Sequence, residues 1–281
     1  MIKRLLAYGR KKLDVLFLSR GYRIKPYRVF DFRDSFKDPR QFHYYGGHPV
    51  LVTISAVSGR CGLFTVNSEI SPYRRAFLRS REEKKDFFST SCEELKVYSR
   101  LFCPKTTEDL YGRDESSKAV DFSVNLPAPL PWKRYSPEEF VKYKKELRVR
   151  FDRDLRRKEG ATVEMESRRF VDLVLSIEKN GYKRNDSPDG DISATVLLKD
   201  DGSWRWIADA GNHRAMVLGL LGYQEFPARI EGIVYRRDAA IWPNVINGTY
   251  SPDYARQVFD RIFDGVPAPA LAPWIERITA G

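Results

Sequence analysis

The residues best suited to chemistry stand where a predicted strand passes into a predicted helix. Asp209-Ala210-Gly211 follows the β-prone run Trp204–Ala208, and Asn212-His213-Arg214 opens the next helical stretch. A glycine at such a turn lets several backbone N–H groups point toward one place, and the helix dipole adds positive potential there. Phosphate is the usual ligand of such a turn, so the pattern predicts an anion-binding site.

Two side chains of this turn extend the prediction. Arg214 is able to give a bidentate guanidinium to the same phosphate oxygens, and His213 can donate a hydrogen bond or move a proton. Gly211, Asn212, His213 and Arg214 are therefore the candidate ligand-binding residues. The alternative interpretation is that Gly211 only permits a tight turn and that Arg214 pairs with a surface carboxylate.

Carboxylates near this turn complete a candidate catalytic set. Phosphoryl transfer needs a cradle for phosphates, a holder for a metal ion and a base for the hydroxyl proton. Glu164, Glu166, Asp209 and His213 are the candidate catalytic residues, with Asp209 and Glu166 as the candidate ligands of Mg²⁺. The alternative for Glu164 and Glu166 is an acidic first turn that favours a helix N-terminus. Asp189 and Asp191 are further carboxylate candidates, although Asp189-Gly190 is more typical of a turn.

These residues need a small set of alternating elements to position them. Hydrophobic periodicity and turn residues predict both helices and strands. The predicted elements are a helix over 167–179 ending at Gly181, a strand over 194–198, a turn at Asp200-Asp201-Gly202, a strand over 204–208, a helix over 212–221, a strand over 226–235, and a helix from Ser251-Pro252 to Gly265.

The order and spacing of these motifs resemble the ParB/sulfiredoxin nucleotide-binding superfamily. The resemblance rests on a helix ending in Ser176-Ile177 before Gly181, on Asp201-Gly202 between two strands, on Gly211-Asn212-His213-Arg214, and on Leu221-Gly222 before Phe226-Pro227. It implies an α+β fold in which a small mixed sheet with flanking helices binds a nucleotide.

The resemblance implies different activities according to the branch of the superfamily. Sulfiredoxin carries a nucleophilic cysteine where Asn212 stands, so its chemistry is not expected. ParB proteins carry a glutamate in their Gly-Glu-Arg-Arg box, and that glutamate is absent here. The free-serine kinases carry an Asp-Gly-His-His-Arg box and an upstream glutamate; Gly211, His213 and Arg214 match this box, and Asp209 lies one position farther from the arginine.

The resemblance therefore leads to two functional expectations. The first is a kinase that uses ATP or another nucleotide with Mg²⁺ and acts on a small-molecule or anionic glycan hydroxyl. The second is a ParB-like DNA-binding protein or nuclease, and a nucleotide-sensing or structural module stays open beside them.

The remaining sequence predicts further regions around this unit. We expect a basic amphipathic segment over 1–28, a separate N-terminal α/β region over 29–125 with strands at 50–54 and 62–66, a Pro-rich linker over 126–135, the ParB/sulfiredoxin-like domain over 136–250, whose first helix opens at Ser136-Pro137, and a C-terminal helix and tail over 251–281.

The net charge of the chain indicates which classes of partner and which location to expect. The chain has 281 residues with 49 Lys and Arg against 38 Asp and Glu, which gives a net charge of +11 and favours polyanionic partners. The basic residues and leucines of 1–28 indicate a membrane-surface or polyanion contact, or an ordinary solvated helix.

Three cysteines without CxxC spacing argue against a zinc or disulfide framework. We expect a cytoplasmic protein, peripheral at the inner membrane surface if residues 1–28 bind lipid.

Overall fold

A computed structural model describes residues 29–35, 38–46, 48–104, 106–112, 130–133, 156–184 and 191–280. Several predictions lie outside these residues. They are the amphipathic helix within 1–28, most of the linker 126–135, the helix opening at Ser136, and the carboxylate of Asp189.

The described strands form one mixed sheet of seven strands in the order β1-β2-β7-β5-β6-β3-β4. Parallel pairs (β1 with β2, β7 with β5, β6 with β3) alternate with antiparallel pairs. The strands are β1 Phe30–Asp31, β2 Val50–Ser55, β3 Gly59–Cys61, β4 Phe64–Thr65, β5 Ser193–Leu198, β6 Trp204–Ala210 and β7 Glu225–Tyr235. Together with the helices this arrangement confirms the predicted α+β class.

The N-terminal strands belong to the same sheet as the C-terminal ones. Strand β2 lies against β7, with Val50 opposite Ile230, and β3 lies against β6, with Gly59 opposite Trp206. The central β7-β5-β6 unit is thus flanked on both sides by strands from the first quarter of the chain. A separate N-terminal α/β region was expected, but its strands do not form a sheet of their own.

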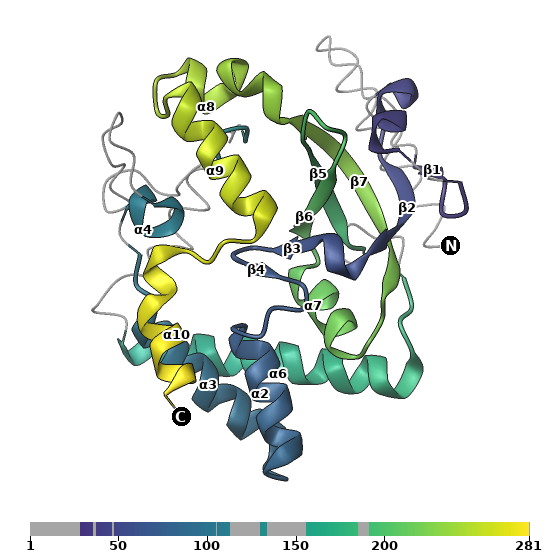
Figure 1. The fold of residues 1–281 in the computed structure, drawn as a ribbon. Helices are drawn as coiled ribbons and strands as arrows, with labels where there is room; N and C mark the ends of the chain where they lie inside the picture. Colours follow the sequence, from purple (N-terminus) through teal and green to yellow (C-terminus); the bar gives the residue numbers. More distant parts are fainter. Residues whose placement is uncertain are drawn as a thin grey trace, which may run out of the picture.

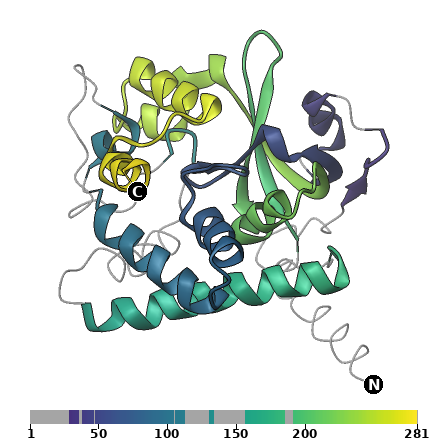
Figure 2. The same cartoon turned by 60° about the horizontal axis from the view of Figure 1, so that its bottom comes forward.

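The described helices surround this sheet. Their bounds are η1 Pro39–Tyr45, η2 Ala56–Ser58, α2 Pro72–Glu82, α3 Phe87–Leu101, α4 Thr107–Tyr111, α6 Arg156–Asn180, α7 Asn212–Leu220, η4 Arg236–Ile241, α8 Pro243–Ile246, α9 Pro252–Asp264, η5 Pro269–Leu271 and α10 Ala272–Thr279. In Figures 1 and 2 the long helix α6 runs along the bottom of the molecule, next to α3 and α7. Among the described helices, none is both long and apolar enough to cross a bilayer.

Different helices pack against the two faces of the sheet. Side chains alternate between the two faces along a strand, so neighbouring residues of one strand belong to different cores. Trp206 and Ala208 of β6 join the main core, which includes residues of α6 and α7. Ile207, between them on the same strand, joins a second core built by α8 and α9. Figure 1 shows these two groups of helices on different sides of the sheet.

Helix α9 has well-defined ends that the sequence indicated. At its start the Ser251 hydroxyl accepts a hydrogen bond from the Tyr254 amide, and Pro252 occupies the first helical position. At its end Gly265 adopts a left-handed conformation with φ of 71°. The buried Arg60 of β3 donates hydrogen bonds to the carbonyl oxygens of Ile262 and Phe263. A cation thus binds carbonyl oxygens in the last turn of the helix, where the helix dipole is negative.

The C-terminal segment packs through Trp274. The sequence predicts a loop-like stretch over Val266-Pro267-Ala268-Pro269, and residues 266–268 lie outside helices and strands; α10 follows, with a fully buried Trp274 side chain. The indole Nε1 donates to the Ile70 carbonyl oxygen at 2.7 Å, and the ring meets Tyr98 of α3 edge-on. This one side chain therefore joins α10 to the segment before α2 and to α3.

The described part of the Pro-rich linker is docked on α8 and α9. Trp132 packs edge-on against Trp242 and Phe259. The Asn244 side-chain amide donates to the carbonyl oxygens of Leu130 and Lys133, both at 2.9 Å. Residues 130–133 are thus a fixed part of the second core rather than a spacer.

Candidate functional site

The predicted turn between strand and helix forms as expected. Strand β6 ends at Ala210, Gly211 adopts φ of 77°, and α7 begins at Asn212. A Cβ atom at Gly211 would lie 2.9 Å from the Asp191 carbonyl oxygen and 3.1 Å from Ile192. Glycine is required here both by its backbone conformation and by its close approach to the chain before β5.

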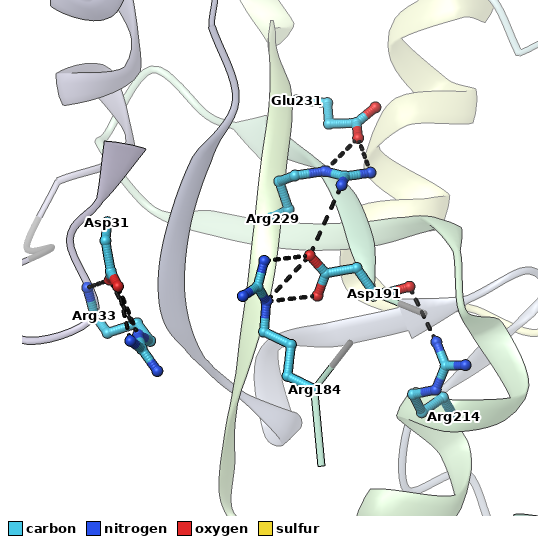
Figure 3. Close-up of polar contacts among 7 residues, drawn as sticks. All are labelled: Asp31, Arg33, Arg184, Asp191, Arg214, Arg229 and Glu231. Atoms are coloured by element: carbon cyan, nitrogen blue, oxygen red, sulfur yellow. Dashed lines mark hydrogen bonds and ion pairs between the residues drawn. The ribbon is translucent and has the colours of Figure 1, made fainter. Parts of the chain in front are cut away.

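Arg214, in the first turn of α7, is held beside this corner. Its Nη1 donates to the carbonyl oxygen of Asp191 at 3.1 Å, and its side chain is partly buried. Figure 3 shows the guanidinium of Arg214 directed at this main-chain oxygen. Because Arg214 is the third residue of α7, its guanidinium group belongs to the helix N-terminus, where the helix dipole is positive.

Asp191 also holds two further arginines through its buried carboxylate. Arg184 approaches it bidentately, with Nε 3.0 Å from Oδ1 and Nη2 2.9 Å from Oδ2. Arg229 of β7 places Nη1 3.8 Å from Oδ2 and is bound on its other side by Glu231. Three guanidinium groups consequently meet at one residue, as Figure 3 shows.

Tyr182 adds a polar atom next to these arginines. Among the residues that the structure describes, its buried hydroxyl has no hydrogen-bond partner. Burial raises the pKa of this hydroxyl, the positive charges of Arg214 and Arg184 lower it, and the charge of Asp191 raises it. Because buried polar groups are normally paired, this donor is suited to a ligand oxygen.

Strand β1 borders this group from the N-terminal region. Its Asp31 is paired with Arg33, with Oδ2 2.7 Å from Nη2. The side-chain hydrogen bonds from Arg33 lower the pKa of Asp31, and the charge of Arg184 contributes to the same shift. The surroundings of the arginines thus include residues from outside the predicted ParB/sulfiredoxin-like domain.

His213 lies in a second polar group with Glu166. The His213 Nε2 is 3.5 Å from Glu166 Oε2 and 3.1 Å from the Tyr73 hydroxyl oxygen. Tyr73 comes from α2 and also packs against Phe170 of α6, so its position is fixed. A carboxylate and a histidine in contact can accept and pass a proton. Two of the predicted catalytic residues are therefore brought together.

The position of Glu164 and Glu166 differs from the expectation. Helix α6 starts at Arg156 rather than near residue 167, so both glutamates lie inside the helix and not before it. Two positions apart, they project from different sides of the helix. Glu164 is exposed, whereas Glu166 also contacts Arg169, at 3.1 Å. The idea of an acidic first turn is wrong for this helix.

Asp209 contacts a different part of the molecule. The register of β5 and β6 shifts there, with Ser193 opposite Ala210 and Ala194 opposite Ala208, which makes Asp209 the extra residue of a β-bulge. Its carboxylate accepts from the Thr195 hydroxyl at 2.6 Å and lies 3.5 Å from the Lys133 Nζ. These contacts are with the linker and the sheet face of the second core.

The carboxylates expected to bind Mg²⁺ are thus not assembled into one site. Glu166 contacts His213, and Asp209 contacts Thr195 and Lys133. Over the described ranges, no group of three or more His, Cys, Asp or Glu side chains is placed to hold a metal ion. A joint role of Asp209 and Glu166 in binding Mg²⁺ stays a prediction.

Asn212 occupies the first position of α7. Its side-chain oxygen is buried, and within the described part of the chain it has no hydrogen-bond partner. All four residues predicted to bind the ligand, Gly211 to Arg214, lie in the first turn of the helix or just before it. The local sequence thus correctly located the corner.

Sequence reasoning did not single out Tyr73, Tyr182, Arg184 or Arg229 as site residues. Tyr182 and Arg184 follow Gly181, just after α6, and the carboxylate of Asp191 seven residues after Arg184 was the available signal. Tyr73 and Arg229 reach the site through long-range packing, for which the local pattern gives no signal.

Comparison of the chain with protein-family models, with curated proteins and with solved structures gives no match.

Proposed function

We propose that this protein binds a nucleotide through its phosphates at the N-terminal turn of α7. The observation that supports the proposal best is the position of Arg214, fixed at that turn by the Asp191 carbonyl, with Arg184 held on the same residue. Guanidinium groups bind phosphate oxygens strongly, and a helix N-terminus favours negative charge. The buried Tyr182 hydroxyl supplies another donor.

The first experiment measures thermal unfolding with ATP or ADP, with and without MgCl₂. A ligand at 100 times its Kd stabilises the folded state by about 2.7 kcal/mol, so the wild-type Tm is expected to rise. In Arg214→Gln, which keeps a polar side chain but loses the guanidinium, most of this rise is expected to disappear. Arg277→Gln, on the exposed face of α10, is the matched control and should respond like wild type.

Two results would oppose the proposal. An unchanged wild-type Tm with both nucleotides would rule out the proposal that the protein binds a nucleotide. A rise that Arg214→Gln leaves intact would place the nucleotide elsewhere on the protein. Duplex-DNA binding that weakens steeply with salt, without any response to nucleotide, would favour the ParB-like alternative.

Phosphoryl transfer is the second candidate function, and the contact between Glu166 and His213 favours it. In this reaction the oxygen of an acceptor hydroxyl forms a bond to the terminal phosphorus of ATP. The bond from that phosphorus to the leaving ADP oxygen breaks, and the hydroxyl proton passes to the Glu166 carboxylate beside His213. Asp209 has no part in this step.

Turnover of a glutamate variant tests this candidate. ADP release from ATP is measured with a panel of free amino acids and sugars that carry hydroxyl groups. Glu166→Gln is expected to retain ATP binding and to lose turnover by a factor of about 10²–10⁴, because its amide cannot accept the proton. Glu164→Gln, exposed on the same helix, is the control. Equal ADP release by wild type and Glu166→Gln would rule out this role.

A further inference from the structure

Asp191 stands out because its side chain is completely buried and charged. The exposed fraction of the side chain is 0%, whereas that of its partner Arg184 is 19%. A buried carboxylate is costly unless several hydrogen bonds and an opposite charge compensate it. Asp191 lies two residues before β5, and Figure 3 shows it between Arg184 and Arg229 on one side and Arg214 on the other.

The two functional groups of Asp191 act on different arginines. The carboxylate accepts both the Nε and the Nη2 of Arg184, which fixes the plane of that guanidinium. The main-chain carbonyl accepts the Nη1 of Arg214. A single residue therefore contacts two of the proposed phosphate-binding side chains, and Figure 3 shows all three together.

Glu231 provides an internal comparison. It is the extra residue of a second bulge, since Ala194 lies opposite Ile230 and Thr195 opposite Gly232. Its carboxylate binds the Nε and Nη2 of Arg229, at 2.7 Å and 2.6 Å. Asp191 and Glu231 thus carry the same charge, but Asp191 alone of the two has described contacts with Arg184 and Arg214.

We propose that Asp191 is a positioning residue that holds Arg184 and Arg214 in the geometry required to bind a phosphate. This inference rests on the proposed function, because it concerns the same site. Asp191 itself does not touch the ligand; a carboxylate would repel a phosphate at short range. Its role is to prevent the two guanidinium groups from turning away when no anion is bound.

The test compares ATP affinity in two variants that lose the same charge. Asp191→Asn and Glu231→Gln each remove one negative charge and keep the side-chain shape. If positioning matters, Asp191→Asn binds ATP about tenfold more weakly or worse, because an amide replaces one of the two acceptor oxygens that face Arg184 by an NH2 donor. Glu231→Gln is expected to bind ATP as tightly as wild type or more tightly.

The opposite result has a clear meaning. If Asp191 only neutralised charge, both variants would bind ATP more tightly, since each makes the region more positive. An Asp191→Asn affinity equal to or higher than that of wild type therefore overturns the inference. Titrations are carried out well below the Tm of each variant, so that a purely structural loss lowers the Tm without changing the affinity.

Arg184→Gln keeps the inference testable if Asp191→Asn does not fold. This change removes the partly exposed partner, and it is expected to weaken ATP binding to a similar degree. Where Asp191→Asn does fold, the double variant should bind no more weakly than the weaker single variant, because the two residues act as one unit. Unchanged affinity in folded Arg184→Gln also overturns the inference.

The two proposals fail in different ways. If wild type does not bind ATP, the proposed function is wrong and the positioning role is wrong with it. If wild type binds ATP and Arg214→Gln does not, while Asp191→Asn binds normally, the proposed function stands and the positioning role is wrong.

Discussion

Replacing Trp274 by alanine is expected to lower the free energy of unfolding by about 3–5 kcal/mol, the usual cost of removing a fully buried tryptophan. The side chain is inaccessible to solvent, and its indole donates a hydrogen bond to the Ile70 carbonyl. The change leaves a cavity beside Tyr98 and an unpaired carbonyl oxygen. Chemical denaturation measures the loss as a lower midpoint.

Glu276→Ala is the matched control for this substitution. Glu276 lies two residues away on the same helix and is exposed, so the unfolding free energy should change by less than about 0.5 kcal/mol. ATP affinity should be unaffected in both variants, because α10 contributes none of the site residues described above. Equal denaturation midpoints for Trp274→Ala and wild type would contradict the role of Trp274 as the anchor of α10.

Arg60→Met is expected to cost about 3 kcal/mol or more, because it removes the arginine donor of the Phe263 carbonyl oxygen and one of the two donors of the Ile262 carbonyl oxygen. Methionine fills much of the space that the arginine stem occupies, so the effect reports the polar contacts rather than a cavity. The cation also lies at the C-terminal end of α9, where a positive charge is stabilising. Thermal and chemical unfolding both measure the change.

Arg256→Met provides the comparison, since Arg256 lies on α9 and pairs there only with the exposed Asp253 among the described contacts. Such a surface ion pair contributes at most about 1 kcal/mol. Arg60→Lys should be intermediate, because an ammonium lacks the planar fork that spans the two carbonyl oxygens. If Arg60→Met lowers the free energy of unfolding no more than Arg256→Met does, the buried contacts of Arg60 contribute little to stability.

Elements whose boundaries depend on nearby residues were predicted well. The strand expected over 194–198 is β5, the helix expected over 212–221 is α7, and the strand expected over 226–235 is β7. Ser251 and Gly265 mark the two ends of α9 as predicted. Caps, turn glycines and apolar periodicity are local signals, so a single sequence is enough to read them.

Features that depend on distant residues were missed. Tyr73 reaches His213 from α2, and Arg229 reaches Asp191 from β7; neither contact leaves a trace in the local pattern. The direction of Asp209 was also missed, because a one-residue bulge changes where a strand side chain points. The corner at Gly211 was therefore predictable, whereas the residues that surround it were not.

The interleaved order of the strands has a consequence for how the chain reaches its native state. Val50 pairs with Phe30 of β1 on one side, but its partner on the other side, Ile230, is synthesised only after most of the chain, so the pairing of β2 with β7 forms late. Such high contact order slows folding. In a nascent or truncated chain that stops before β7, the edge of β2 that faces β7 is unpaired, and this apolar edge is prone to aggregation. Expression of the N-terminal strands without the C-terminal half is therefore expected to give insoluble material.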